Sequence, residues 1–128
     1  MAAGEWRFDE SLWPVLIIEA PPQLTRDGWK AVFRELERTY LPRPGPGKKV
    51  FITTEGGAPS LLLAGSTVPW WLRNRHLLRR ELHGWALVLP TPHVRAAVEY
   101  MVWWVSPSID VVYFGTRAEA IKWAFSKL

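Results

Sequence analysis

Five short apolar stretches recur along the chain and predict five β-strands. In the first, Glu5 to Phe8, polar and apolar residues alternate, as in an edge strand with one buried face. The second, Trp13 to Ala20, is almost wholly apolar and rich in β-branched residues, which is typical of a strand buried on both faces. Three further apolar runs, at 50–53, 85–89 and 111–114, predict the remaining strands.

Apolar residues at three- and four-residue steps predict four helices between and after these strands. The first follows Thr25, a favourable N-cap, and the second is a single amphipathic helix over 66–82. The third begins with Pro92 in its first turn, where the missing N–H costs nothing. The fourth begins at Thr116, three residues before Glu119, which is the spacing of a capping box.

The order of these elements predicts the fold class. Two strands and a helix are followed by three strand–helix units, which favours an α/β fold with right-handed crossovers. We therefore expect one mixed sheet of about five strands, mostly parallel, with about four helices. A chain of 128 residues has the size of one domain, so we expect residues 1–128 to form a single unit.

The composition of the chain bears on the cellular compartment in which it is expected to work. There is no cysteine, so neither a disulfide framework nor a thiolate metal site is expected, and a reducing cytoplasm fits. The charged stretch Glu5-Trp6-Arg7 follows Met1 closely, and the longest apolar runs fall short of the roughly 20 residues that span a bilayer. We expect a cytoplasmic location.

Few residues suit catalysis. The histidines, His76, His83 and His93, lack metal-ligand spacing, and neither a nucleophile elbow nor a phosphate-binding loop is present. Loops that leave parallel strands gather at the carboxyl edge of a sheet, where sites form. That edge is predicted to be rich in hydroxyls, with Thr53, Thr54, Ser60, Ser66, Thr67, Thr91 and Thr116. We expect no enzyme activity, no metal and no cofactor.

The segment 66–82 carries the most distinctive surface. On a helical wheel Trp71, Leu72, Leu78 and Leu82 face the core, whereas Trp70 and most basic residues face outward. The outer face has three interpretations: a solvated face, a dock for an acidic protein, or a grip for nucleic acid or anionic lipid. A net charge of only +4 argues against nucleic acid. The candidate partner-binding residues are Trp70, Arg73, Asn74, His76 and Arg80.

Nine tryptophans are more than a small core hides easily, so some are expected at the surface. Trp103 and Trp104 are about 100° apart on their helix, so at least one should lie near the rim of the core. With Tyr100 they are candidates for an apolar pocket wall, a membrane contact or a homodimer face. A membrane is the less favoured of these partners.

The chain as a whole resembles a known family. The strand "WPVLIIEA", the helix "WWLRNRHLLRREL", the strand and helix "GWALVLPTPHVRAAVEYMVWWVSP" and the ending "VVYFGTRAEAIKWAF" together resemble a STAS domain, the fold of bacterial anti-sigma-factor antagonists. The resemblance covers about Glu5 to Leu128 and is closer to the divergent STAS-like proteins of proteobacteria and myxobacteria.

The resemblance implies a function. In antagonists of this family a serine or threonine at the start of the second helix is phosphorylated, which makes Ser60, Ser66 and Thr67 candidates, although the aspartate usual before it is missing here. It implies a non-enzymatic protein–protein interaction module in bacterial signalling that docks a partner through residues 54–80. The alternative is a small-molecule or lipid binder of CRAL-TRIO-like character.

Overall fold

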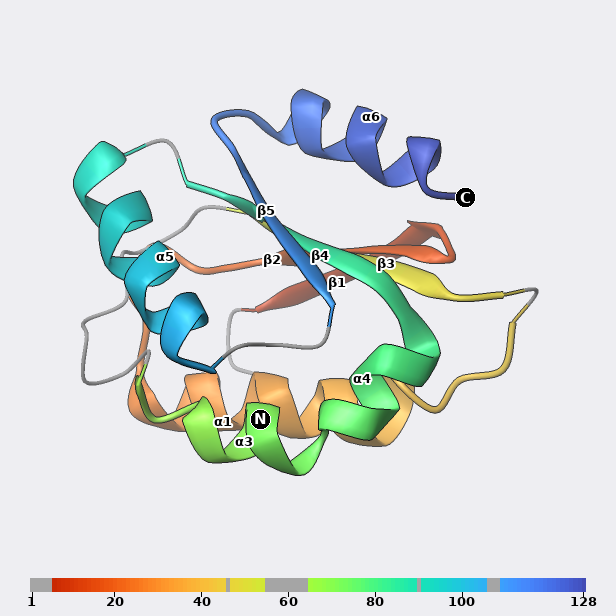
Figure 1. The fold of residues 1–128 in the computed structure, drawn as a ribbon, viewed down its shortest axis with the longest axis horizontal. Helices are drawn as coiled ribbons and strands as arrows, with labels where there is room; N and C mark the ends of the chain where they lie inside the picture. Colours follow the sequence, from red (N-terminus) through yellow and green to blue (C-terminus); the bar gives the residue numbers. More distant parts are fainter. Residues whose placement is uncertain (1–5, 46, 55–64, 90, 106–108) are drawn as a thin grey trace.

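The chain forms an α/β fold around one five-stranded mixed sheet (Figure 1), which confirms the predicted fold class. The computed structural model describes residues 6–45, 47–54, 65–89, 91–105 and 109–128. In chain order the elements are β1 (Arg7–Leu12), β2 (Val15–Glu19), α1 (Arg26–Glu35), the π-helical turn η1 (Leu36–Tyr40), β3 (Lys49–Thr54), α3 (Val68–Arg73), α4 (Arg75–Glu81), β4 (Leu82–Val88), α5 (Pro92–Val105), β5 (Asp110–Phe114) and α6 (Arg117–Ser126).

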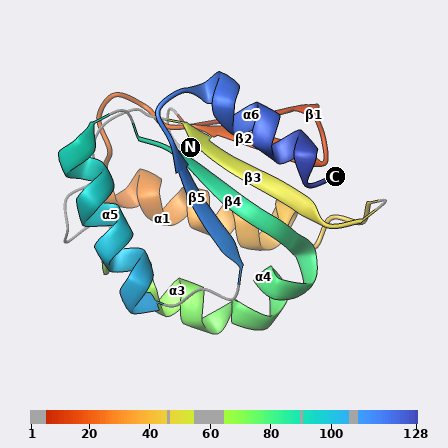
Figure 2. The ribbon, with the colours of Figure 1, turned by 45° about the horizontal axis from the view of Figure 1, so that its top comes forward.

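The strands lie side by side in chain order, from β1 to β5. Strand β1 is antiparallel to β2, and the other neighbours are parallel. Because each crossover moves across the sheet in the same direction, crossovers of one hand place their helices on one face. Figures 1 and 2 show α1, α3 and α4 on one side of the sheet and α6 on the other.

The two faces of the sheet have different cores. On the α6 face, aliphatic side chains of β2, β3 and β4 pack against Ala120 and Ala124 of the helix. On the opposite face the core is aromatic, and Phe51 and Trp85 of the sheet meet Trp70 of α3. Strand β2 is buried on both faces from Val15 to Ile18, as its sequence predicts.

Two helix starts follow the sequence prediction. The Thr25 hydroxyl accepts a hydrogen bond from the Gly28 N–H at 3.0 Å, and the Thr116 hydroxyl accepts one from the Glu119 N–H at 3.3 Å. Each bond satisfies a backbone donor that the first turn of a helix leaves without a partner.

The segment 66–82 differs from its prediction. It forms two short helices, α3 and α4, that meet at Asn74, where the backbone leaves helical geometry at φ −100° and ψ 13°, and Leu82 already belongs to β4. The Asn74 amide donates to Glu37 Oε1 at 2.7 Å and to the Trp70 carbonyl at 3.0 Å. A wheel drawn for one continuous helix therefore assigns Trp70 and Leu72 to the wrong faces, while its prediction that Leu78 and Leu82 lie in the core is confirmed.

Trp70 is the clearest consequence of this break. Its side chain is only 7% exposed and packs edge-on against Phe33 at 4.9 Å between ring centroids, so the prediction that it lies outside is wrong. Leu72, predicted to face the core, is 52% exposed. In α3 the side chain of Trp70 instead packs toward α1 and the sheet.

Candidate functional site

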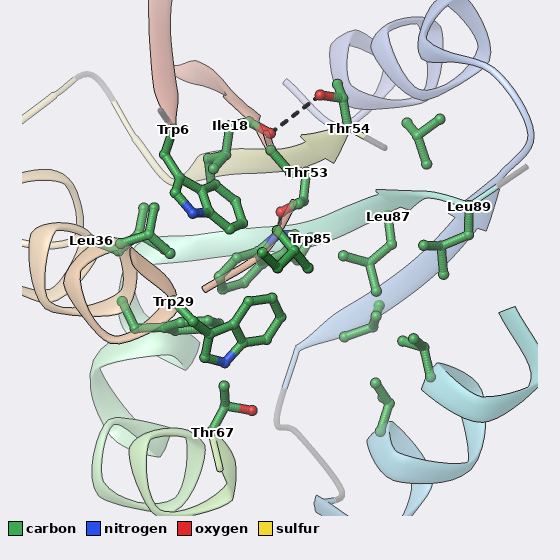
Figure 3. A pocket seen from close by; sticks show the side chains of 18 of the residues that line it. Trp6, Ile18, Trp29, Leu36, Thr53, Thr54, Thr67, Trp85, Leu87 and Leu89 are labelled. Carbon is green, nitrogen blue, oxygen red and sulfur yellow. Dashed lines mark hydrogen bonds between the residues drawn. The ribbon is translucent and has the colours of Figure 1, made fainter. Parts of the chain in front are cut away.

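An apolar cavity of about 110 Å³ lies between the sheet and the helices of its aromatic face (Figure 3). Ile18, Thr53 and Leu87 form part of its wall because they are register partners on neighbouring strands and point to the same face. All three are near the carboxyl ends of their strands. The cavity is therefore at the edge where the sequence predicts a site.

Tryptophan rings make much of the remaining wall. Trp6 and Trp29 meet edge to face with ring centroids 6.1 Å apart, and Trp71 and Trp85 lie 5.1 Å apart. The Trp85 N–H donates to the Thr53 hydroxyl at 2.8 Å, which ties that ring to the next strand. Rings fixed in this way keep the shape of the wall.

Helix α5 contributes Val98 and Val102, one turn apart on the same side of the helix. Tyr100 and Trp103 lie on another side, stack with ring centroids 6.5 Å apart, and are 62% and 70% exposed. The prediction that they line an apolar pocket is therefore wrong for this cavity, while the prediction that one tryptophan of the 103–104 pair lies at the surface is confirmed. The structure does not describe the side chain of Trp104.

The wall of the cavity is almost wholly apolar. Among the described residues it contains no carboxylate, imidazole, ammonium or guanidinium group, and its hydroxyls come from Thr53, Thr54 and Thr67. Thr54 donates to the Ile18 carbonyl at 3.4 Å, and Thr53 accepts from Trp85. Nor do the described residues place three possible metal ligands together. The wall is thus suited to holding an apolar group.

The predicted partner-binding residues separate into two groups. Arg73, His76 and Arg80 are exposed; Arg73 pairs with Glu37 at 3.2 Å and Arg80 with Glu81 at 3.0 Å. Trp70 and Asn74 are buried, and the Asn74 amide donates to the Trp70 backbone carbonyl, so the prediction that these two residues form surface contacts is wrong. The break at Asn74 causes both errors.

The candidate phosphorylation sites also differ in access. Ser66 is exposed, whereas Thr67 is 4% exposed and lies against the cavity. Burial of the Thr67 hydroxyl leaves Ser66 as the accessible residue of the two. Ser60 lies outside the described residues.

Comparison with family models, curated proteins and solved structures finds no match for this chain. The resemblance to STAS domains therefore stays a prediction. Within the described ranges, no helix combines the length and the apolar character that crossing a bilayer requires.

Sequence reasoning found the hydroxyls of the site but missed its walls. Trp29, Trp85 and Val98 fit the helix and strand periods of an ordinary core, so nothing in the pattern separates them from it. The excess of tryptophan was the available signal, because nine indoles are more than a core of this size hides easily.

Proposed function

We propose that this chain is a non-enzymatic binding domain that holds a small apolar ligand in the cavity beside Trp29, Trp85 and Val98. The observation that carries the proposal is a cavity of about 110 Å³ with rigid aromatic walls. A dry cavity of about 150 Å³ in another protein takes up benzene, so this volume suits one ring or a short chain.

The energetic argument points the same way. At about 24 cal/mol per Å³, an empty cavity of this size costs roughly 2–3 kcal/mol of stability. An apolar ligand restores the lost contacts, and a ligand that binds only the folded state raises the stability further. The absence of ionisable groups from the described wall favours binding over catalysis.

The test is the binding of toluene to the purified protein, followed by calorimetry and by tryptophan fluorescence. Val98→Phe places a ring in the cavity and is expected to weaken toluene binding at least about tenfold, because the larger side chain occupies the space that the ligand needs. Val94→Phe is the matched control, because Val94 is on the same helix but does not line the cavity.

Two results would contradict the proposal. Toluene binding that survives Val98→Phe would place the ligand elsewhere, and no uptake of toluene by the wild-type chain would show that the cavity does not bind apolar molecules. Leu87→Phe, from the sheet side of the same wall, is the second variant if Val98→Phe does not fold.

A second candidate function rests on the stacked pair Tyr100 and Trp103. Exposed aromatic side chains are typical anchors of protein interfaces, and such a contact suits the bacterial signalling module that the STAS resemblance implies. Their exposure supports either a protein partner or a second copy of the chain. Sedimentation at high concentration tests the second copy: Trp103→Ala should remove any dimer, and a wild-type chain that stays monomeric removes that option.

A further inference from the structure

A second hollow adjoins the cavity and differs from it in charge. It has a volume of about 230 Å³, and it shares the residues Trp29, Phe33 and Thr67 with the cavity wall. Its own wall includes Lys30 and Arg34 of α1 and Arg73 of α3; we call it the cationic pocket. The two hollows are therefore neighbours, with three side chains in common.

The cationic pocket has an excess of positive charge. Three cationic side chains line it, and the one carboxylate among its described lining residues, Glu37, already accepts hydrogen bonds from Arg73 and Asn74. None of the ion pairs in the described part of the chain includes Lys30 or Arg34. An anion placed here would meet two cations that no described carboxylate neutralises.

Two buried indole N–H donors belong to tryptophans that line the cationic pocket. The Nε1 atoms of Trp29 and Trp70 are buried and have no hydrogen-bond partner among the described residues, and both tryptophans line the cationic pocket. A buried donor without a partner is costly, and such groups are rare in folded proteins. In Figure 3 the indole nitrogen of Trp29 points toward Thr67, the residue shared by both hollows.

From these observations we infer that the ligand is a small carboxylic acid with an apolar body. The body, a single aromatic ring, occupies the cavity, and the carboxylate lies in the cationic pocket near Lys30 and Arg34, where it accepts hydrogen bonds from the indole N–H groups. This inference rests on the proposed function, since it adds a head group to the ligand of the same cavity. Aromatic walls favour a ring over a straight chain of similar volume.

The experiment compares three probes by calorimetry at neutral pH. Phenylpropionate carries the ring and the carboxylate, phenylpropanamide carries the same ring with a neutral head, and hexanoate carries the carboxylate on a straight chain. We expect phenylpropionate to bind about tenfold more tightly than the amide, because hydrogen bonds to a charged acceptor are stronger than neutral ones. Added salt should reduce this preference, since Lys30 and Arg34 are exposed.

Substitutions of Lys30 and Arg34 test where the carboxylate of the ligand binds. Lys30→Gln combined with Arg34→Gln should abolish the preference for phenylpropionate over its amide and leave toluene binding unchanged, because neither residue lines the cavity. Lys122→Gln is the matched control: it is an exposed lysine on α6, across the sheet, and should keep the full preference.

The outcomes separate the two proposals. Equal binding of phenylpropionate and its amide, with toluene still bound, overturns the carboxylate inference and leaves the apolar cavity in place. A preference that survives in the double variant overturns the placement in the cationic pocket. If hexanoate binds more tightly than phenylpropionate, the aromatic body is wrong, and if no probe binds, the proposed function fails as well.

Discussion

Lys49 and Glu81 form a buried ion pair whose removal gives the most direct test of the fold's energetics. The Lys49 side chain, at the start of β3, is 1% exposed; its ammonium donates to Glu81 Oε1 at 2.7 Å and to the Leu41 carbonyl at 3.0 Å. Glu81 is 22% exposed and also accepts from Arg80. Lysine is rarely buried so completely without a paired charge.

We expect Glu81→Gln to destabilise the fold by about 3 kcal/mol, the low end for breaking a buried pair. The low end applies because the Leu41 carbonyl still solvates the ammonium and Glu81 reaches the surface. Lys49→Met should cost less, since it removes the buried charge instead of leaving it unpaired. Urea unfolding followed by tryptophan fluorescence measures both; at an m-value of about 1.5 kcal/mol/M, the midpoint of Glu81→Gln should fall by about 2 M.

The pH dependence gives a second readout of the same pair. The hydrogen bond from Lys49, with a smaller one from Arg80, lowers the pKa of Glu81 below its ordinary value. Its contribution to stability is therefore present above the pKa of an unfolded glutamate and is lost as the pH falls through the lowered pKa. The difference between wild type and Glu81→Gln should shrink over that acid range. Equal urea midpoints at neutral pH, or a difference that does not change with pH, would refute the reasoning.

Two further predictions concern other parts of the fold. Gly84→Ala should destabilise the fold by about 1–3 kcal/mol in a thermal melt, which is the usual cost of overpacking a core: a Cβ there would lie 2.8 Å from the Trp123 ring and 2.9 Å from the Asp110 backbone oxygen. Gly47→Ala is the control, because a Cβ at that position would have nothing within 4 Å. Equal melting temperatures of the two variants would contradict the prediction. Burial, with the hydrogen bond to Glu10, raises the pKa of Tyr40 to about 12. Stability should therefore fall as the pH rises from about 10, the ordinary pKa of a tyrosine, to about 12. Tyr40→Phe should remove one late-ionising tyrosine from the ultraviolet titration, and an unchanged titration would contradict it.

The sheet was predictable because its signal is local and repeated. Buried strands such as Val15–Glu19 read as unbroken apolar runs, and the caps at Thr25 and Thr116 have short, specific spacings. Each of these features depends on residues a few positions apart. The parallel pairing of the later strands also followed, because repeated strand–helix units join parallel strands.

The faces on which Trp70 and Leu72 lie were not predictable for the opposite reason. Asn74 stops α3 by bonding to Glu37, which is distant in sequence, and no periodicity shows that contact. A few residues of helix on each side then pack independently, and Trp70 is buried while Leu72 is exposed. Tertiary contacts outweigh local preference most easily in helices this short.

The cavity differs in its position from the usual binding crevice of an open parallel sheet. In open parallel sheets the binding crevice forms where strand order reverses and adjacent crossovers leave to opposite faces. Here the order follows the chain from β1 to β5, so there is no reversal, and the hollow lies between the sheet and one helical layer. The side chains that enclose it, Trp29 and Trp85 among them, are also part of the core or packed against it. Stability and ligand binding therefore depend on the same contacts, and a variant that fills the cavity should weaken binding while it keeps or raises the melting temperature.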